Sequence, residues 1–313
     1  MRVLVTGAAG FIGSNFLRYC NAKNPDWEMV GFDDLSTGSL ANVEGVDVSM
    51  IVGSVADPDT ISEAAQNVDA IVHLGALGSV PRSVADPVTS HVANLTGTLN
   101  VLEAARKNNA YVTFASSSSV YGANLKLPKS EFDWTRPMSP YAVTKLGAEA
   151  YVLAYQRSYG LPTLAFRFFN VYGPRQAAGH AYAAVIPKFL EAAYSGRPLT
   201  VHGDGMQSRD FTFVESVAAV LHSAVHRRVV AEDPVNLAYG TNTSLMQLVS
   251  LLREKTGLDL EVEHVESRVG DVRASQSDGV RVRELFPEIE PVSLESGLDK
   301  TIDWFAADVD AVK

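Results

Sequence analysis

Several kinds of site are excluded by what this sequence lacks. Cys20 is the only cysteine, so the chain can form neither an internal disulfide framework nor a cysteine-based metal site. The seven histidines are scattered without the H-E-x-x-H spacing of a zinc-binding helix, and we therefore expect no metal. No apolar run reaches the ~20 residues that a membrane-spanning helix needs, so we expect no transmembrane segment.

Basic charge is also scarce. Lys and Arg number 26 against 36 Asp and Glu, which gives a net charge of −10. Because no basic block occurs, we expect neither nucleic acid nor a membrane as a partner, and a bound phosphate would need arginines placed locally. The N-terminal run M-R-V-L-V-T-G-A-A-G is strand-like and lacks the apolar region of a signal peptide, which predicts a cytoplasmic protein.

Short apolar runs alternate with longer helical patterns in the first half of the chain. Nearly continuous apolar runs are typical of strands that are buried on both faces. Repeated strand–helix–strand units predict an α/β fold with a doubly wound parallel sheet, the Rossmann arrangement. The expected strands are Val3 to Thr6, Met29 to Phe32, Ile51 to Val52, Ala70 to Leu74, Tyr111 to Ala115 and Leu164 to Phe168. The expected helices lie near Phe11 to Cys20, Ile61 to Gln66, Val92 to Asn108 and Ala142 to Tyr159.

Gly7, Gly10 and Gly13 lie between the first expected strand and the first expected helix. In a dinucleotide-binding turn, these glycines allow the tight turn, the approach of a pyrophosphate to the backbone, and close helix–strand packing. The strand–turn–helix context favours this interpretation over an ordinary glycine turn. We therefore predict that residues 1–170 form mainly a dinucleotide-binding domain. Residues 171–313 are interrupted by Gly- and Pro-containing loops, and we expect a smaller substrate-binding part with some segments returning to the sheet.

Two aspartates follow the second and third expected strands. Asp33 is placed to bond the adenosine ribose and to repel a 2′-phosphate, which favours NAD over NADP. Asp57 lies where a side chain could reach the adenine, but it also precedes Pro58 as a helix N-cap would. The sequence leaves both interpretations of Asp57 open.

Tyr141 and Lys145 are one helical turn apart in the run S-P-Y-A-V-T-K, so both side chains can serve one site. A nearby cation favours the phenolate form of a tyrosine, which would make Tyr141 a proton-transfer group. Four consecutive serines, Ser116 to Ser119, follow the fifth expected strand, where open α/β sheets bind ligands. Taken alone, these features also suit an amphipathic helix and a polar turn.

The combination of these motifs is more specific than any one of them. The glycine run, H-L-G-A at 73–76, Asn94, S-S-S-S-V-Y-G and Tyr141-x-x-x-Lys145 together resemble the extended short-chain dehydrogenase/reductase family. The runs R-F-F-N-V-Y-G-P-R-Q (167–176), S-R-D-F-T-F-V-E-S-V (208–217) and S-R-V-G-D-V-R-A-S-Q-S-D (267–278) are similar to those of nucleotide-sugar epimerases and dehydratases. The resemblance covers nearly the whole chain.

The resemblance implies a mechanism. Tyr141, as the phenolate, takes the proton from the sugar 4-OH while the C4 hydride passes to tightly held NAD. The 4-keto sugar then rotates and receives the hydride on its other face. Lys145 bonds the nicotinamide ribose and keeps Tyr141 ionised, and Ser117 bonds O4. The implied cofactor contacts are Gly7, Gly10, Phe11, Ile12, Gly13, Asp33, Asp57, Leu74, Ala76, Asn94, Tyr141 and Lys145.

The resemblance also implies a UDP-sugar substrate. Arg209 and Arg268 would clamp its diphosphate, because a planar guanidinium can bond two phosphate oxygens at once. The implied substrate contacts are Ser79, Ser117, Ser118, Asn170, Val185, Thr200, His202, Arg209, Arg268, Asp271 and Ser275. Family members commonly dimerise through the helices near Val92 to Asn108 and Ala142 to Tyr159, which predicts a homodimer.

Several positions bear on the reaction and the sugar. Sugar dehydratases carry an Asp-Glu pair where Ser118 and Ser119 stand here, so epimerisation at C4 is favoured over elimination. Ala177 stands where uronate epimerases tend to have an Arg. Ser275 lies at the gate position beside the sugar's 2-substituent, where a small residue admits an N-acetyl group. The runs at 75–90 and 181–189 resemble UDP-N-acetylglucosamine 4-epimerases.

We therefore expect a UDP-hexose 4-epimerase that accepts UDP-GlcNAc and UDP-GalNAc as well as UDP-glucose and UDP-galactose. The alternatives are an epimerase restricted to plain hexoses or to a UDP-hexuronate, a nucleotide-sugar dehydratase, and a non-catalytic NAD-binding regulator. Asp34 and Ser54 depart from the family pattern, which has Asn and Asp there, near the adenosine end of the cofactor.

Overall fold

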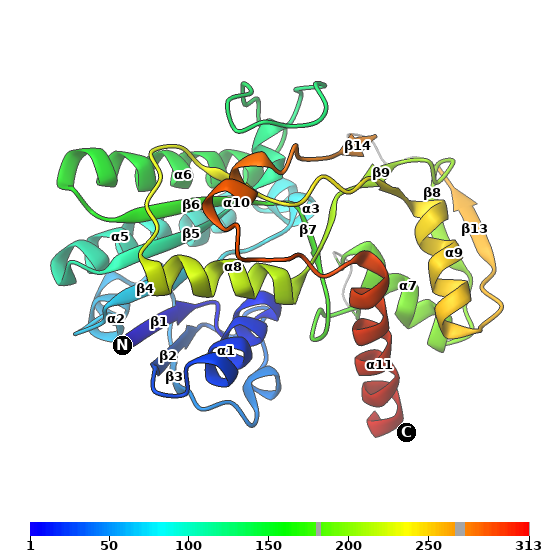
Figure 1. Cartoon of the computed structure of the whole chain (residues 1–313), viewed down its shortest axis with the longest axis horizontal. Helices are drawn as coiled ribbons and strands as arrows, with labels where there is room; N and C mark the ends of the chain where they lie inside the picture. Colours follow the sequence, from blue (N-terminus) through cyan, green and yellow to red (C-terminus); the bar gives the residue numbers. More distant parts are fainter. Residues whose placement is uncertain (180–182, 267–272, 313) are drawn as a thin grey trace.

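The computed structural model describes residues 1–179, 183–266 and 273–312. Within these residues, seven strands form one parallel sheet in the order β11-β6-β5-β4-β1-β2-β3 (Figure 1). The strands are β1 (Arg2–Thr6), β2 (Glu28–Asp33), β3 (Ser49–Val52), β4 (Ala70–His73), β5 (Tyr111–Ser117), β6 (Thr163–Phe168) and β11 (Val235–Leu237). Because β1 lies beside both β2 and β4, the strand order reverses there and the sheet is doubly wound. The predicted fold class is confirmed.

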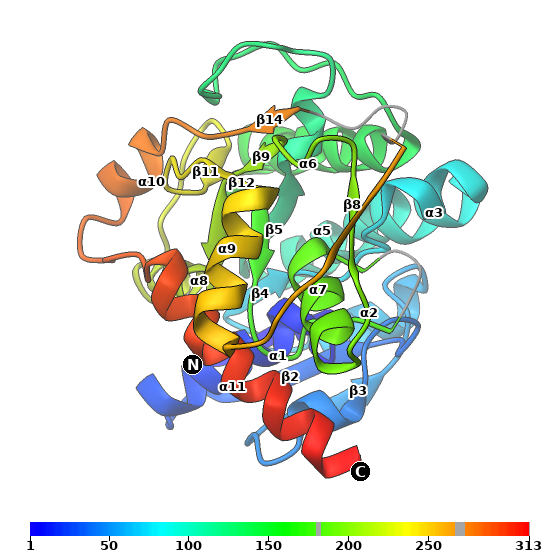
Figure 2. The same cartoon turned by 90° about the vertical axis from the view of Figure 1, so that its right-hand side faces the viewer.

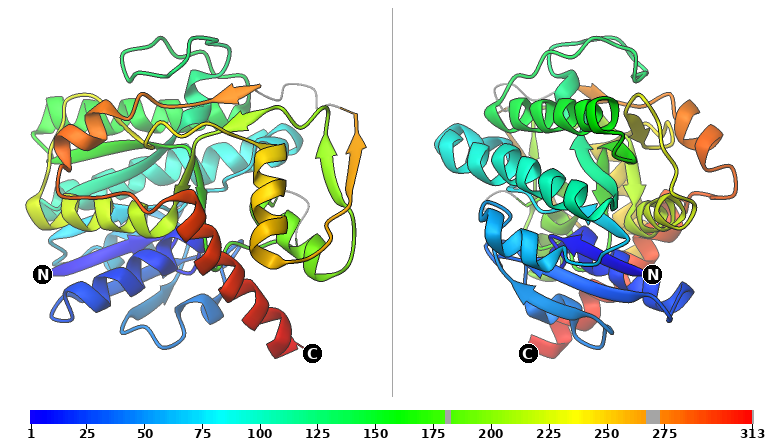
Figure 3. Two further views of the ribbon diagram at one scale, coloured as in Figure 1. Left: turned by 45° about the vertical axis from the view of Figure 1, so that its right-hand side comes forward. Right: turned by 90° about the vertical axis from the view of Figure 1, so that its left-hand side faces the viewer.

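Helices cover both faces of this sheet (Figure 3). One face is covered by α1 (Phe11–Lys23), α8 (Val214–Arg227) and α10 (Val280–Leu285). The other is covered by α2 (Pro58–Ala64), α5 (Gly97–Asn108) and α6 (Pro140–Tyr159). The strand β11 and the helices α8 and α10 come from the second half of the sequence, so the chain returns to the sheet after leaving it.

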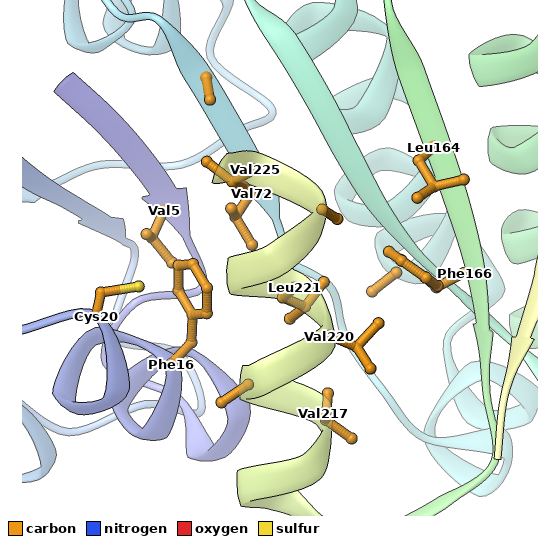
Figure 4. Packing of buried hydrophobic residues seen from close by; sticks show 14 of the residues in the cluster. Val5, Phe16, Cys20, Val72, Leu164, Phe166, Val217, Val220, Leu221 and Val225 are labelled. Carbon is orange, nitrogen blue, oxygen red and sulfur yellow. The ribbon is translucent and has the colours of Figure 1, made fainter. Parts of the chain in front are cut away.

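The central residues of the strands are mostly apolar, because each face of the sheet has its own core. Successive side chains of a strand point to opposite faces. In β1, Val3 and Val5 belong to the core under α1 and α8, whereas Leu4 belongs to the core under α2, α5 and α6. Figure 4 shows α8 turning Leu221 and Val225 toward the strands.

Local sequence signals fix the start of α6. Ser139 caps the helix, because its side chain accepts a hydrogen bond from the amide of Ala142 (3.2 Å). Pro140 occupies the first helical position, where no amide donor is needed. Gly160 ends the helix in the left-handed conformation (φ +66°). Tyr141 is therefore held in the first turn of a 20-residue helix.

The helix expected near Val92 to Asn108 is divided into a π-helical turn η2 (Val92–Thr96) and α5. Two helices that were not predicted from the sequence, α3 (Val80–Ala85) and α4 (Pro87–His91), precede it. The break between α3 and α4 is explained by Asp86, whose carboxylate caps α4 by accepting from Thr89 N (3.0 Å). A further short helix, η3 (Ser118–Tyr121), follows β5 directly.

The rest of the chain forms a smaller part beyond the carboxyl ends of the strands (Figure 2). Its core is built from α7 (Val185–Tyr194), α9 (Leu245–Thr256) and α11 (Leu294–Val312). Its strands are short: β7 (Asn170–Tyr172) pairs with β10 (Phe211–Phe213), β8 (Leu199–His202) with β13 (Val262–Val265), and β9 (Ser208–Arg209) lies between β12 (Thr243–Ser244) and β14 (Ala274–Ser275). The short helix η1 (Leu40–Val43) lies in the connection between β2 and β3.

Among the described residues, no helix combines the length and the apolar character that crossing a membrane would require.

Candidate active site

The glycine turn after β1 leaves no room for side chains. Gly7 adopts a left-handed conformation (φ +70°), and a Cβ there would lie 2.8 Å from the amide nitrogen of Gly75. A Cβ on Gly13 would lie 2.1 Å from the carbonyl oxygen of Gly7. The N-terminus of α1 therefore approaches the end of β1 as closely as its backbone permits. This is the geometry in which backbone amides and the helix dipole meet a pyrophosphate.

A cavity of about 550 Å³ opens above this turn, along the carboxyl ends of β1, β2 and β4. Its lining includes eight of the residues predicted to hold the cofactor: Gly7, Gly10, Phe11, Ile12, Gly13, Asp33, Leu74 and Ala76. Glycine backbone at one side and a carboxylate at the other fit a dinucleotide, which needs pyrophosphate and ribose partners. The residues present therefore suit NAD.

Asp33 lies at the end of β2 with its carboxylate buried. One carboxylate oxygen accepts from Ala9 N (2.9 Å) and the other from Leu35 N (2.8 Å). Burial raises the pKa of Asp33, and the hydrogen bonds from Leu35 and Ala9 oppose that shift. Each oxygen keeps lone-pair capacity, so the same carboxylate can also accept from a ribose hydroxyl.

Three other residues predicted to contact ligands, Asp57, Ser79 and Asn94, form hydrogen bonds within the protein. Asp57 is exposed and caps α2, accepting from Asp59 N (3.1 Å) and from Thr60 Oγ1 (2.5 Å). Its N-cap interpretation is confirmed, and it is not among the residues that line the cavity. Ser79 lines the cofactor cavity and caps α3, accepting from Arg82 N (3.1 Å). Its assignment to the substrate stays a prediction.

Asn94 acts as a tether within the described structure. Its side-chain oxygen accepts from Leu77 N (2.7 Å), and its amide group donates to Leu77 O (3.2 Å) and Thr144 Oγ1 (3.1 Å). These bonds fix the H-L-G-A loop against α6, and that loop lines the cofactor cavity. Whether Asn94 also contacts the cofactor stays a prediction.

The three predicted catalytic residues are brought together at the end of β5. The side chain of Ser117 lies close enough to Tyr141 to lower the pKa of its phenol. Lys145 lies one turn further along α6 and donates from Nζ to Ala115 O (2.7 Å). Ser117 also accepts from Ser119 N (3.2 Å) and Ser119 Oγ (2.9 Å). Ser118, predicted to touch the substrate, lies between these two serines at the start of η3.

The electrostatics of this group differ from the simple expectation. Burial raises the pKa of Tyr141, and the hydrogen bond from Ser117 lowers it in part. Burial lowers the pKa of Lys145 to about 7. His73, also buried, has its pKa lowered to about 3 by burial and by Lys145. Within the protein alone, Ser117 rather than Lys145 is the neighbour that favours the phenolate.

A second cavity of about 760 Å³ lies in the C-terminal part. Its lining includes five residues predicted to contact the substrate: Asn170, Val185, Thr200, His202 and Arg209. Arg209 in β9 stands in register with the gate residue Ser275 in β14. Two further predicted contacts, Arg268 and Asp271, lie outside the described residues.

The predicted catalytic residues lie near the linings of both cavities. Ala115 of β5, whose carbonyl accepts from Lys145, lines the cofactor cavity, and Phe169, which follows β6, lines the second cavity. Among the described residues, neither lining includes Ser117, Tyr141 or Lys145 themselves. Their contact with a bound sugar and a nicotinamide stays a prediction.

Sequence reasoning missed Asp210, which follows Arg209. Its buried carboxylate accepts from Gly240 N (3.0 Å), Ser277 N (3.0 Å), Thr241 N (3.1 Å) and Thr241 Oγ1 (2.8 Å). Its backbone amide donates to Ser275 O (2.8 Å). Asp210 thus ties distant loops together beside Arg209 and Phe211, which line the second cavity. No spacing in the sequence could reveal this, because its partners are 30 to 67 residues away.

Comparison with known proteins agrees with this geometry. A family model described as "NAD dependent epimerase/dehydratase family" matches residues 3–238. The chain is 36% identical to a UDP-glucose 4-epimerase of Mycolicibacterium smegmatis, over 97% of this chain and 98% of that protein. Nucleotide-sugar dehydratases and a UDP-glucuronic acid 4-epimerase are also among the matches.

Solved structures give the same picture. The chain is similar to a UDP-N-acetylglucosamine 4-epimerase from Methanobrevibacter ruminantium in complex with UDP-N-acetylmuramic acid, with a TM-score of 0.91, 34% identity and 98% of both chains covered. It is also similar to a UDP-glucose 4-epimerase from Thermotoga maritima with UDP-glucose, with a TM-score of 0.92, 33% identity, and 99% of this chain and 100% of that chain covered.

Proposed function

As a member of the NAD dependent epimerase/dehydratase family, the chain is an NAD-dependent nucleotide-sugar 4-epimerase, and we propose that it accepts both N-acetylated and plain UDP-hexoses. The proposed substrates are UDP-GlcNAc and UDP-GalNAc together with UDP-glucose and UDP-galactose. The observation that supports this proposal is the register of the small residue Ser275, predicted to be the gate, with Arg209, which lines the second cavity.

The proposed division of labour follows from the positions of the side chains. Bound NAD supplies the redox chemistry by accepting the C4 hydride and giving it back. Tyr141 takes the proton from the sugar O4 and later returns it, while Ser117 holds the same oxygen through its hydroxyl. Lys145 has further donors besides its bond to Ala115, which lines the cofactor cavity, and in this proposal they bond a ribose hydroxyl of the cofactor.

The nucleotide would be held in the second cavity by resident polar groups. Arg209 supplies the positive charge that two phosphates require in an acidic protein, and Asn170 adds an amide donor nearby. Thr200 and His202 lie on β8, at the wall where the base would be placed. In this proposal Arg268 completes the diphosphate clamp, but it lies outside the described residues.

Elimination of water is disfavoured by the lack of a carboxylate pair near Ser117. Among the lining residues of the second cavity, the carboxylate is Glu191, which is ion-paired with Arg197 (3.2 Å). A dehydratase needs an acid and a base beside C5 and C6. Ser118 and Ser119 occupy the two positions after Ser117, and neither hydroxyl can replace an ionised carboxylate.

The substrate proposal is tested by incubating the protein with UDP-glucose, UDP-galactose, UDP-GlcNAc, UDP-GalNAc and UDP-glucuronate. The C4 configuration of the products is read by NMR. We expect interconversion within both hexose pairs and no turnover of the uronate. No activity on the N-acetylated pair would refute the assignment of the gate.

The gate is tested separately by Ser275→Tyr. The larger ring should fill the space of the acetamido group, so kcat/KM for the N-acetylated pair should fall at least ~100-fold while the plain pair keeps most of its activity. Ser250→Tyr, on the exposed face of α9, is the matched control. An equal loss on both substrate pairs would contradict the gate assignment.

We also propose a homodimer. Exposed valines recur every four residues at Val80, Val84, Val88 and Val92, and Val143 and Tyr151 are exposed on the neighbouring α6. Such apolar surface on adjacent helices favours helix–helix association. Light scattering should give twice the mass of the chain, and a Val88→Glu/Val143→Glu variant should shift toward the monomer. A monomeric wild-type protein would refute this proposal.

A further inference from the structure

Two consecutive residues at the end of β5 are bonded to side chains of α6. Ala115 O accepts from Lys145 Nζ (2.7 Å), and Ser116 Oγ donates to Glu149 Oε2 (2.6 Å). The next residue, Ser117, is the neighbour whose side chain lowers the pKa of Tyr141. Tyr141, Lys145 and Glu149 are spaced by four residues, so they follow one face of the helix. The proposed mechanism uses the first two and leaves Glu149 without a role.

The carboxylate of Glu149 is buried together with the guanidinium of Arg167 from β6. Arg167 Nε donates to Glu149 Oε2 (3.0 Å) and Arg167 Nη2 to Glu149 Oε1 (2.7 Å), which makes a bidentate pair. The side chains are only 5% and 3% exposed. The remaining donors of Arg167 reach the hydroxyl of Tyr121 (2.9 Å) and the carbonyl of Glu131 (3.2 Å).

A buried ion pair of this kind is a weak source of stability. Removing two charges from water costs several kcal/mol per ion, and apolar residues of similar volume are often as good or better for stability. Arg167 and Glu149 nevertheless join β6, β5 and α6 at the level of Ser116. The effect of the pair is to fix a position. Arg167 holds the carboxylate of Glu149 in one place, and Ser116 donates its hydrogen bond to that carboxylate.

We propose that Glu149, held by Arg167, is a positioning residue for the proton-transfer group. Through Ser116 it fixes the end of β5 against α6, and this sets the distance between Ser117 and Tyr141. The inference rests on the proposed function, because it takes Tyr141 as the group that exchanges a proton with O4. Loss of the anchor would let Ser117 move away from Tyr141, whose pKa it lowers.

The molecule contains a second Ser–Glu–Arg group that serves as an internal control. Ser223 Oγ donates to Glu288 Oε1 (2.5 Å), and Arg227 donates from Nε to Ser223 Oγ (2.9 Å) and pairs with Glu288 (3.1 Å). Ser223 and Arg227 lie on α8 and Glu288 follows α10, and the two charged side chains are 41% and 46% exposed. It has the same chemistry as the first group but no contact with the catalytic residues.

The first experiment compares Ser116→Ala with Ser223→Ala, measuring kcat and KM against pH together with Tm. Ser116→Ala should lower kcat about 10-fold or more with little change in KM or Tm, since a misplaced reacting group costs rate rather than binding. The acid limb of its kcat profile should move to higher pH, because Tyr141 loses part of the bond that lowers its pKa. Ser223→Ala should change none of these. An unmoved acid limb and a wild-type kcat in Ser116→Ala would overturn the proposal.

The second experiment separates positioning from stability. The variant Glu149→Leu/Arg167→Met removes both charges at once, so neither is left buried and unpaired. It should keep its NAD and its Tm but show the kcat loss and pH shift of Ser116→Ala. Adding Ser116→Ala to it should cause no further loss, because both changes break one connection. A stable double variant with wild-type kcat would overturn the proposal, and if it does not fold, Ser116→Ala alone decides.

Failure of the proposed function can be told apart from failure of this inference. A wild-type protein that turns over no UDP-sugar would refute the function. The positional link would still be measurable as a higher phenol pKa in Ser116→Ala than in the wild type, from ultraviolet titration of the holoenzyme with Tyr141→Phe as the blank. Equal titration of wild type and Ser116→Ala would refute the link.

Discussion

The two ligand spaces of this molecule are built in different ways. The cofactor space lies at the ends of β1, β2 and β4, and it is shaped by backbone that is packed too closely for side chains at Gly7 and Gly13. The second space is walled by the helix α7, by strands of two to four residues and by loops, and Asp210, which follows the lining residue Arg209, ties distant loops together beside it. The first therefore depends mainly on the sheet, and the second also depends on a few buried polar bonds next to its wall.

The proposed chemistry follows the same division. Ser117, Tyr141 and Lys145, the proposed catalytic residues, come from β5 and from α6, which covers the sheet. The residues proposed to bind the nucleotide come from the smaller part. If the division is real, changes in the sheet should affect the rate of turnover, and changes in the smaller part should affect binding of the UDP-sugar.

The largest effect is expected for Tyr141→Phe. The ring stays and the hydroxyl is lost, so no group remains to exchange the O4 proton, and kcat should fall about 10²–10⁴-fold. Calorimetry should show unchanged UDP-sugar binding, because Arg209 and Asn170 lie in the other part of the molecule. Tyr151→Phe, exposed on the same helix, is the control. Near-wild-type turnover would show that Tyr141 does not transfer the proton.

The sequence predicted the sheet more completely than it predicted the smaller part. The six strands expected in the first 170 residues all exist, because burial on both faces leaves a continuous apolar signal. Gly7, Gly10, Gly13 and Asp33 were predicted from their positions after the first two strands, and the structure places all four at one cavity. β5 continues two residues beyond the expected end, because Ser116 and Ser117 pair with β6 despite being polar.

The smaller part was less accessible to such reasoning. Its two-residue strands β9, β12 and β14 are too short to carry a period-two pattern, and β11 joins the sheet from far along the chain. The substrate residues there were reached by resemblance to known motifs. Asp210 was missed because its importance depends on partners from distant loops.

An intermediate effect is expected for Asp210→Asn. One carboxylate oxygen becomes an amide that faces the N–H donors of its present partners, so the loops near Ser275 and Arg209 should shift. KM for UDP-sugars should rise about 10-fold or more, while kcat and bound NAD change little.

Asp204→Asn is the matched control, because Asp204 belongs to the same part but is exposed, and among the described residues its carboxylate has only an ion pair with Arg273 (3.4 Å) and a local bond from Met206 N (2.9 Å). A fall in kcat with unchanged KM would contradict the division between the two parts.

The smallest effect concerns stability, and it is expected where the sheet carries a buried charge. Burial lowers the pKa of Lys145 to about 7, well below the ~10.4 of an unfolded chain. Below pH 7 the Lys145 amine is protonated in both the folded and the unfolded chain, so the free-energy cost of burying its charge is fully present. Between pH 7 and about 10.4 the unfolded state binds more protons, so this cost disappears as the pH rises. Replacing Lys145 by an apolar residue would remove this cost and so raise the stability, but it would also remove the hydrogen bond to Ala115, which reduces the increase.

Lys145→Met, freed of NAD, should therefore have a Tm about 2–5 °C above that of the equally treated wild type at pH 6–7, and the gap should shrink toward pH 10. Turnover should be lost at the same time, as expected where a functional site is held at the expense of stability. Lys255→Met is the control from the smaller part, because Lys255 is paired with Asp299 (2.6 Å) and should give no such gain. A gap that stays constant between pH 6 and pH 10 would show that the charge of Lys145 does not limit the stability of the sheet.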